Sequence, residues 1–492
     1  MNATSRESES TSSHYRGFPS GEYHSPNYAA EVKDKPSKSQ SSSRLAGFLF
    51  LANYTWNDIY LADVSVRFDG SSEFGLDQKW APFWSFGAGV NMHNYAFLSG
   101  SKVINRMKFR ASYGQTGKVN FPSYSARTVY RTFDRWYIAG FGVGLKALGN
   151  RDLKWETTNK LNVGTDMEFW NSRISLIFDY YYNKTVDLIT DVTLPGSAGF
   201  SSYKSNLGET LNKGFDIQFR FDVMKNKDWN VALWGNLNHN KNEILKISDA
   251  LKAYNSQVDD YYELAEEDQT SNSSWSKANK TYSDFIKPIM KYEEGASLTA
   301  IYGVRSLGID PSIGKELYLY RNGLASHKWK ATEEVVLGDS EPKASGSFGL
   351  NATYKNFSLF ASFGYEWGKQ TYNETLIMNV ENADIRGSNV DKRVLTQRWE
   401  KPGDIAPLKD IKDMNSVTLP TSRFVQDENV LSLDALALSY DFDPLWLRKI
   451  YLKTLRLEVS TSELFRLSSI KQERGTSYPF ARTVNFSLRA TF

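Results

Sequence analysis

Two glycine-rich segments are the nearest approach to a cofactor-binding motif in the sequence. Residues 140–144 read Gly-Phe-Gly-Val-Gly and resemble half of a dinucleotide loop, but no strand-to-helix pattern surrounds them. Residues 308–315 imitate a phosphate-binding loop with one residue too many, and Glu316 stands where that motif needs Ser or Thr. Both segments are interpreted as loops, and we expect no bound cofactor.

Catalytic and metal-ligating residue types are sparse. The chain has no cysteine, which excludes a thiolate ligand, a cysteine nucleophile and disulfides. The histidines lack the spacing of a zinc site; they are His14, His24, His93, His239 and His327. A pair of carboxylates such as Asp259 and Asp260 could in principle hydrolyse a glycosidic bond. These two lie in a run of charged residues, which is typical of a solvated surface. We therefore predict no catalytic residue, no metal site and no enzyme.

Composition narrows the class of protein further. The 492 residues include 59 Lys+Arg and 56 Asp+Glu, a balance that gives no electrostatic footprint of a nucleic-acid binder. The longest apolar stretch, residues 46–52, is far shorter than the roughly 18 residues of a membrane helix. The mean hydropathy of −0.49 is typical of soluble proteins. It is also compatible with a membrane barrel, whose strands alternate lipid-facing and lumen-facing residues.

Period-two alternation is the main structural signal. In residues 213–223, an apolar row of Phe215, Ile217, Phe219, Phe221 and Val223 faces away from Asp216, Gln218, Arg220 and Asp222. About fifteen such runs follow residue 44, each near the length that crosses a bilayer as a tilted strand.

The links between these runs alternate in length. Residues 171–172 and 355–356 form tight connections, whereas residues 184–206 and 243–297 form long ones. Outer-membrane barrels have this alternation because short turns face the periplasm and long loops face outward. The sequence therefore predicts an all-β fold, a transmembrane antiparallel β-barrel with about fifteen strands present. A soluble all-β glycan-binding or hydrolytic domain, such as a propeller, is the alternative.

Three sets of residues follow from this fold. Charged side chains on the polar faces are candidate lumen-facing residues, namely Lys108, Arg110, Asp166, Glu168, Asp216, Arg220 and Asp222. Aromatic residues in the long loops are candidate contacts for substrate or a partner protein, namely Trp136, Tyr137, Tyr261, Tyr262 and Trp275. The apolar face of the last strand has the form of a barrel assembly signal and comprises Val484, Phe486, Leu488, Ala490 and Phe492.

The domain organisation is expected to be simple. Residues 1–43 are rich in Ser, Lys and Glu and are interpreted as a flexible lead-in. Residues 44–492 are expected to form the C-terminal portion of a barrel. Residues 1–13 are almost wholly polar, so we expect no signal peptide in this sequence.

Four longer segments are distinctive, namely VSVRFDGSSEFG at 64–75, LGNRDLKWETTNKLNVGTD at 148–166, LPGSAGFSSYKSNLGETLNKGFDI at 194–217 and YPFARTVNFSLRATF at 478–492. These segments resemble the SusC/RagA family of TonB-dependent outer-membrane transporters of Bacteroidetes. Family members carry a plug domain and a barrel of about 22 strands, and only the later strands are matched here. At 462–465 the chain reads Ser-Glu-Leu-Phe where the family usually has Asn-Leu-Phe, which indicates a diverged member.

The resemblance implies nutrient import across the outer membrane of a Gram-negative cell. The implied cargo is an oligosaccharide or a peptide, and the implied partners are a SusD-like lipoprotein lid, outer-membrane lipid and TonB, which acts through a plug not present in this chain. A weaker alternative is a passive porin or a truncated remnant without energy coupling.

Overall fold

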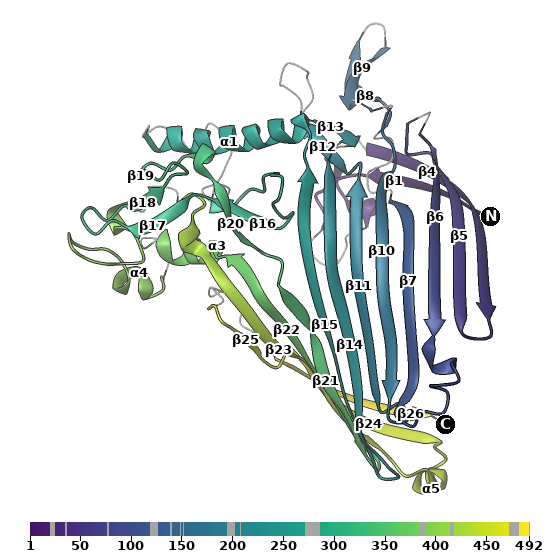
Figure 1. Cartoon of the computed structure of the whole chain (residues 1–492). Helices are drawn as coiled ribbons and strands as arrows, with labels where there is room; N and C mark the ends of the chain where they lie inside the picture. The colour runs from purple at the N-terminus through teal and green to yellow at the C-terminus, as the bar shows by residue number, and fades with distance from the viewer. Residues whose placement is uncertain are drawn as a thin grey trace.

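A computed structural model gives the fold of the chain (Figure 1). It describes residues 1–19, 25–34, 37–75, 78–118, 126–137, 140–147, 149–150, 152–193, 202–206, 208–270, 286–383, 385, 389–413, 418–471 and 482–491.

One 15-stranded antiparallel sheet forms the wall of the molecule, as the alternation predicts. Its order is β1-β4-β5-β6-β7-β10-β11-β14-β15-β21-β22-β23-β24-β26, and β25 pairs with β23. The strands are β1 (Asn2–Ser12), β4 (Ser37–Trp56), β5 (Tyr60–Ser71), β6 (Trp80–Asn91), β7 (Ile104–Lys118), β10 (Glu156–Phe169), β11 (Ile174–Val186), β14 (Glu209–Lys225), β15 (Trp229–Lys246), β21 (Ala344–Tyr354), β22 (Phe357–Tyr372), β23 (Val425–Asp441), β24 (Thr454–Ser462), β25 (Arg466–Ser468) and β26 (Thr483–Thr491).

The hairpin connections confirm the predicted alternation of short and long links. Asn57 and Asp58, between β4 and β5, have φ of 53° and 55°. Two successive residues in the left-handed region form the tight turn that matches the twist of paired strands. The links after β11, β15 and β22 are long and lie at the opposite end of the wall from these turns (Figure 1).

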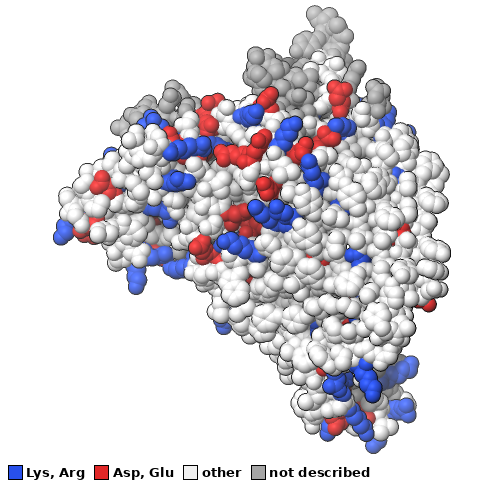
Figure 2. All heavy atoms as spheres, viewed as in Figure 1, with Lys and Arg blue, Asp and Glu red and all other residues white. Residues whose placement is uncertain are grey.

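The apolar rows of the wall are exposed, which is the reverse of a soluble fold. On β14, Phe219 and Phe221 are 45% and 39% exposed, whereas Asp222 is 8% exposed. The same exposure recurs at Val64, Val66, Phe68, Trp84, Phe86, Leu161, Val163, Phe178, Tyr180, Tyr182 and Leu233. Figure 2 shows a face of the wall with few charged side chains, which gather above and below it. A continuous apolar band of this kind needs lipid to cover it. The structure therefore contradicts the alternative of a propeller or sandwich, whose apolar sides would face each other.

The first 43 residues contain part of the wall. Strand β1 pairs with β4 from Asn2↔Gly47 to Ser12↔Ser37, and every β1 side chain is exposed. The expected boundary at residue 44 falls inside β4. Composition does not reveal this pairing, because a polar strand is held by backbone hydrogen bonds to its neighbour rather than by an apolar face.

Further strands extend from the wall as small sheets. They are β2 (Tyr15–Arg16) with β3 (Glu31–Val32), β8 (Val129–Tyr137) with β9 (Gly140–Ala147), β12 (Ile189–Thr193) with β13 (Ser202–Asn206), β16 (Ala300–Gly303) with β20 (Val335–Asp339), and β17 (Arg305–Ile309) with β18 (Glu316–Leu319) and β19 (Ala325–Ser326).

Most helices are short. The exception is α1 (Asp249–Thr270), which begins where Leu251 N–H donates to the Ser248 hydroxyl at 3.3 Å. The others are α3 (Glu374–Leu376), the π-helical η5 (Ile377–Glu381), α4 (Arg393–Thr396), α5 (Pro444–Leu447), and the 3-10 turns η1 (Pro26–Tyr28), η2 (Met92–Asn94), η4 (Ala331–Glu333), η6 (Ile411–Asp413), η7 (Ser422–Phe424) and η8 (Arg448–Ile450). Within the described residues, no helix is both long and apolar enough to cross a membrane.

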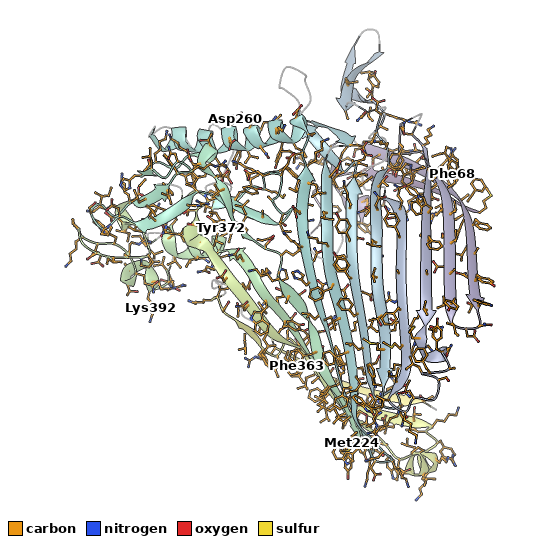
Figure 3. The ribbon with its side chains drawn as sticks, viewed as in Figure 1. Phe68, Met224, Asp260, Phe363, Tyr372 and Lys392 are labelled. Atoms are coloured by element: carbon orange, nitrogen blue, oxygen red, sulfur yellow. The ribbon has the colours of Figure 1, made fainter. Side chains whose placement is uncertain are left out.

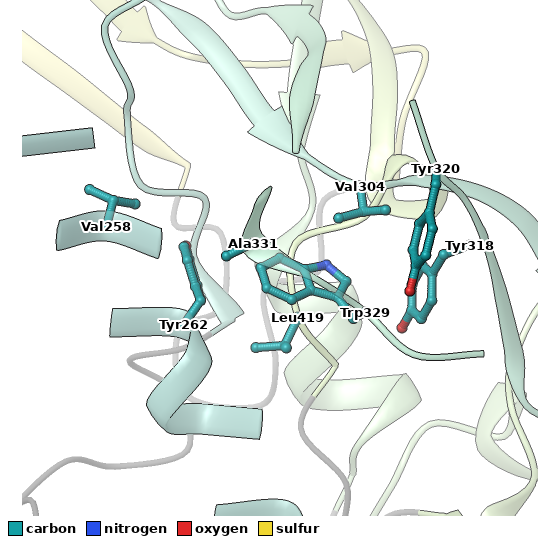
Figure 4. Close-up of a cluster of buried hydrophobic side chains, with 8 residues drawn as sticks. All are labelled: Val258, Tyr262, Val304, Tyr318, Tyr320, Trp329, Ala331 and Leu419. Carbon is teal, nitrogen blue, oxygen red and sulfur yellow. The ribbon is translucent and has the colours of Figure 1, made fainter. Parts of the chain in front are cut away.

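The largest buried cluster lies in the loops rather than in the wall. We call the described residues within 249–343 and 373–424 the loop module, because they pack together beside the upper end of the sheet (Figure 1). Its core joins segments far apart in sequence, and its members are Val258, Tyr262, Val304, Tyr318, Tyr320, Trp329, Ala331 and Leu419 (Figure 4). The long links are therefore a folded unit with an interior of its own.

Candidate functional site

The polar face of the wall carries a network of paired charges on β7, β10 and β11. The Arg110 guanidinium donates to Asp179 at 2.7 Å and to Asp166 at 3.2 Å. Gly164 lies opposite both Arg110 and Asp179, and a Cβ there would meet Asp179 Oδ1 at 2.3 Å. Glycine at this position therefore makes room for the pair. Glu168 completes the network, 3.6 Å from Arg106.

The remaining predicted lumen-facing residues lie on the same face. Asn238 Nδ2 donates to Asp216 at 2.5 Å, and the Arg220 guanidinium donates to Asp222 at 3.0 Å. Lys108 lies opposite Asp166 and lines a cavity of about 290 Å³ together with Arg110. The register thus brings the basic and acidic residues together on neighbouring strands. A face of this kind can line a water-filled passage and bind polar groups. The role of these charged residues in transport stays a prediction.

The predicted aromatic contacts separate in the structure. Trp136 and Tyr137 belong to β8, above the wall (Figure 1), and Trp275 lies outside the described residues. Tyr261 is partly buried and packs against the core. Tyr262 is fully buried, and its hydroxyl donates to Lys287 O, which differs from the loop contact expected from the sequence. The reason is that α1 turns this residue into the core of the loop module.

The proposed assembly signal forms β26, which pairs with β24 along its whole length. Val484, Phe486 and Leu488 are 52%, 77% and 68% exposed, and Ala490 is exposed as well. Phe492 lies outside the described residues. The remaining residues of β26 are exposed as well, so exposure does not separate its two faces, and the assembly role of the apolar residues stays a prediction.

A buried lysine joins helix α1 to the rest of the loop module. Lys291 Nζ lies 2.5 Å from Asp259 on α1 and 2.6 Å from Glu334, and it donates to Ala331 O at 3.2 Å. Figure 3 shows Asp260, the next residue, on the same helix. Burial raises the pKa of Glu334 to about 7, although the positive charge of Lys291 acts to lower it. We call Lys291, Asp259 and Glu334 the α1 clasp.

A second buried centre connects the two halves of the loop module. Arg423 Nη2 lies 2.7 Å from Glu316 and 2.7 Å from Glu381, and the Thr421 hydroxyl donates to Glu316 at 2.6 Å. Burial acts to raise the pKa of the Glu316 carboxyl, but the positive charge of Arg423 outweighs it and holds that pKa below its usual value. In each centre one cation lies between two carboxylates from different segments, so each centre links separate parts of the loops.

Sequence reasoning missed these centres. Glu316 and Arg423 are 107 residues apart, and Lys291 and Asp259 are 32 apart. Neither pair forms a motif, so only the tertiary structure shows them. Among the described residues, no group of three or more His, Asp or Glu is arranged to hold a metal ion.

These features define a class of protein. A single antiparallel sheet that is apolar on one face and lined by paired charges on the other, with its long loops gathered at one end, is the wall of an outer-membrane β-barrel.

The comparisons with known proteins agree with this class. Residues 4–383 match the family described as "TonB dependent receptor-like, beta-barrel", and the chain belongs to that family. TonB-dependent receptor P3 of Formosa agariphila is 28% identical over 456 residues, and SusC of Bacteroides thetaiotaomicron is 24% identical over 464 residues. These alignments cover 88% and 89% of this chain but 42% of each relative, so the chain spans less than half of their length.

Solved structures show the same fold. The RagAB peptide importer in its open-open state superposes with a TM-score of 0.76 at 22% identity, covering 96% of this chain and 48% of the importer chain. The RagAB peptide transporter gives a TM-score of 0.73 at 23% identity, covering 91% and 46%. The predicted resemblance to the SusC/RagA family is confirmed.

Proposed function

We propose that this chain is the barrel part of an outer-membrane importer for oligosaccharides or peptides, energised through TonB and covered by a SusD-like lipoprotein. The observation that carries the proposal is the wall, because its exposed apolar face suits lipid while its other face carries paired charges. Membership of a receptor family and the likeness to SusC support it.

The polar face and the loop module have different roles in this proposal. Arg110, Asp166 and Asp179 line the passage, where charged groups that already satisfy one another leave room for hydrated cargo. The loop module receives cargo and the lipoprotein at the outer end of the barrel. The α1 clasp and the Arg423 centre keep that receiving surface in one shape.

Uptake in the native host tests the proposal. Cells with the gene deleted should lose uptake of fluorescently labelled oligosaccharides or peptides, and collapse of the proton-motive force should abolish the same uptake in wild-type cells. Uptake that depends on the gene but persists without the proton-motive force would instead indicate a passive porin. Extraction of the protein without detergent would contradict a membrane location.

A further inference from the structure

The wall contains a slot where β15 and β21 separate. Their pairing ends at Asn238↔Ser345, although β15 continues to Lys246. Further along, Ile244 closes the gap again, because its N–H donates to the Ala296 carbonyl and its carbonyl accepts from the Gly295 N–H, both at 2.8 Å. In the described part of the chain, the intervening residues 239–243 have no strand partner on this side.

The open stretch of β15 directs backbone groups into the slot. Pairing of β15 with β14 is continuous from Ala232 to Ile244, so its N–H and C=O groups alternate in direction without a break. Since the groups of Ile244 point away from β14, those of Asn242 and Asn240 point the same way. Unpaired groups on a strand edge are a template for an added extended strand.

The slot has the size of a small-ligand site. Its cavity is about 680 Å³ and is lined on the far side by Asp339, Glu341 and Gln370. Sites for small ligands span about 300–1,000 Å³. A strand rises about 3.3 Å per residue, so the open stretch is on the order of 17 Å long, which suits about four or five residues. The β21 pairing at one end and the Ile244 contacts at the other bound this stretch along β15.

Side-chain bridges hold the two sides of the slot at a fixed separation. Asn240 Nδ2 donates to Glu341 Oε1 at 2.5 Å, and Leu298 N–H donates to Asn242 Oδ1 at 2.8 Å. Asp339 is held in turn, because its N–H donates to Gln370 Oε1 at 3.1 Å. The edge is therefore positioned before any ligand arrives, which reduces the entropy lost on binding.

Charges at the two ends of the slot are opposite in sign. Lys343 lies at the Asn238 end, where its carbonyl is 2.5 Å from His239 Nδ1. Lys343 forms no ion pair with any residue that the structure describes. Glu293 and Glu294 line the opposite end, beside the Ile244 closure. Glu293 also lies 3.7 Å from Arg321, and one oxygen of Glu294 accepts from the Ile247 N–H at 3.2 Å. A peptide antiparallel to β15 would place its α-carboxylate at Lys343 and its α-ammonium at the two glutamates.

We propose that this slot binds a peptide of about four or five residues with free termini, as an added strand antiparallel to β15. The inference rests on the proposed import function and names a peptide as the cargo class. An oligosaccharide has no row of amides to pair with the β15 edge, and it has no terminal charges to match Lys343 and the glutamates.

Calorimetry on the detergent-solubilised protein tests the proposal. Pentapeptides with free termini should bind, while the same peptides acetylated and amidated at their ends should bind roughly tenfold more weakly or worse. Ala296→Trp should abolish binding because it fills the slot, whereas Ala325→Trp, at an exposed site on β19, should leave Kd unchanged. Equal binding of the peptides to both variants would overturn the proposal, as would tighter binding of maltopentaose to the wild type.

Chemical labelling covers the case in which Ala296→Trp does not fold. The chain has no cysteine, so Val336→Cys creates a single thiol in the slot and Ala325→Cys a single thiol outside it. Pentapeptide should slow maleimide labelling at residue 336 and leave labelling at residue 325 unchanged. Equal labelling rates with and without peptide would overturn the slot assignment even if cellular uptake is intact. If wild-type cells show no energised uptake but the purified protein still binds the peptide, the import function is contradicted and the slot assignment is not.

Discussion

Replacing Lys291 with methionine tests whether the α1 clasp holds helix α1 on the loop module. The Lys291 side chain is 6% exposed, and it lies between Asp259 on α1 and Glu334, which is 0% exposed. Methionine keeps much of the chain length but removes the cation, so two carboxylates face each other across a buried space. Removing one partner of a buried ion pair costs about 3–5 kcal/mol. That cost raises the population of undocked α1 roughly 150- to 5,000-fold.

Hydrogen exchange measures this population directly, because the amides of α1 exchange when the helix undocks and opens. We expect Lys291→Met to accelerate exchange across Asp249–Thr270 by roughly that factor, while exchange in β14 stays unchanged. Lys252→Met is the matched control, because Lys252 pairs with Asp249 on the exposed side of the same helix, where a pair contributes about 0–1 kcal/mol. Adding Glu334→Gln to Lys291→Met should restore part of the protection. Equal exchange of α1 in Lys291→Met and wild type would refute the clasp.

Three further predictions concern charge and the faces of the wall. Burial raises the pKa of Glu334 from 4.5 to about 7. Between pH 4.5 and 7 the folded state therefore keeps a proton on Glu334 that the unfolded state has lost, and the free energy of unfolding falls as pH rises through this range. Glu334→Gln should flatten that part of the pH profile of thermal unfolding, and an unchanged profile would contradict it. Arg423→Leu leaves two buried carboxylates unpaired and should destabilise the loop module by about 3–5 kcal/mol in urea unfolding; a change below about 1 kcal/mol would count against the centre. Phe219→Arg should lower barrel stability in lipid by about 2–4 kcal/mol and Gln218→Arg much less, and equal effects would mean that β14 has no lipid-facing side.

The wall could be predicted from the sequence because its signal is local. In a strand, successive side chains point to opposite faces. The apolar row from Phe215 to Val223 therefore shows which face is apolar, whatever strands lie beside it. The two-residue turn at Asn57-Asp58 is local for the same reason. These signals were enough to predict the strands, the alternation of link lengths and the polar face that carries Arg110 and Asp166.

The loop module could not be predicted in this way. A sequence of mixed polarity between two strands reads as a loop, yet residues 249–270 form a helix whose Tyr262 is fully buried. Burial of that residue depends on Trp329 and Leu419, which are distant in sequence. The polar strand β1 was likewise hidden, because it has no apolar face: backbone hydrogen bonds and the exposed Glu9–Lys38 ion pair hold it to β4.

The sequence by itself determined the antiparallel wall, its two faces and the family, because period-two alternation and contiguous phrases are properties of short segments. Only the tertiary structure decided which charges meet and where β15 loses its partner. Lys291 with Glu334, Arg423 with Glu316, and the slot beside Asn240 each bring together residues from separate links. Contacts of that kind depend on chain closure over many residues, which local patterns do not encode.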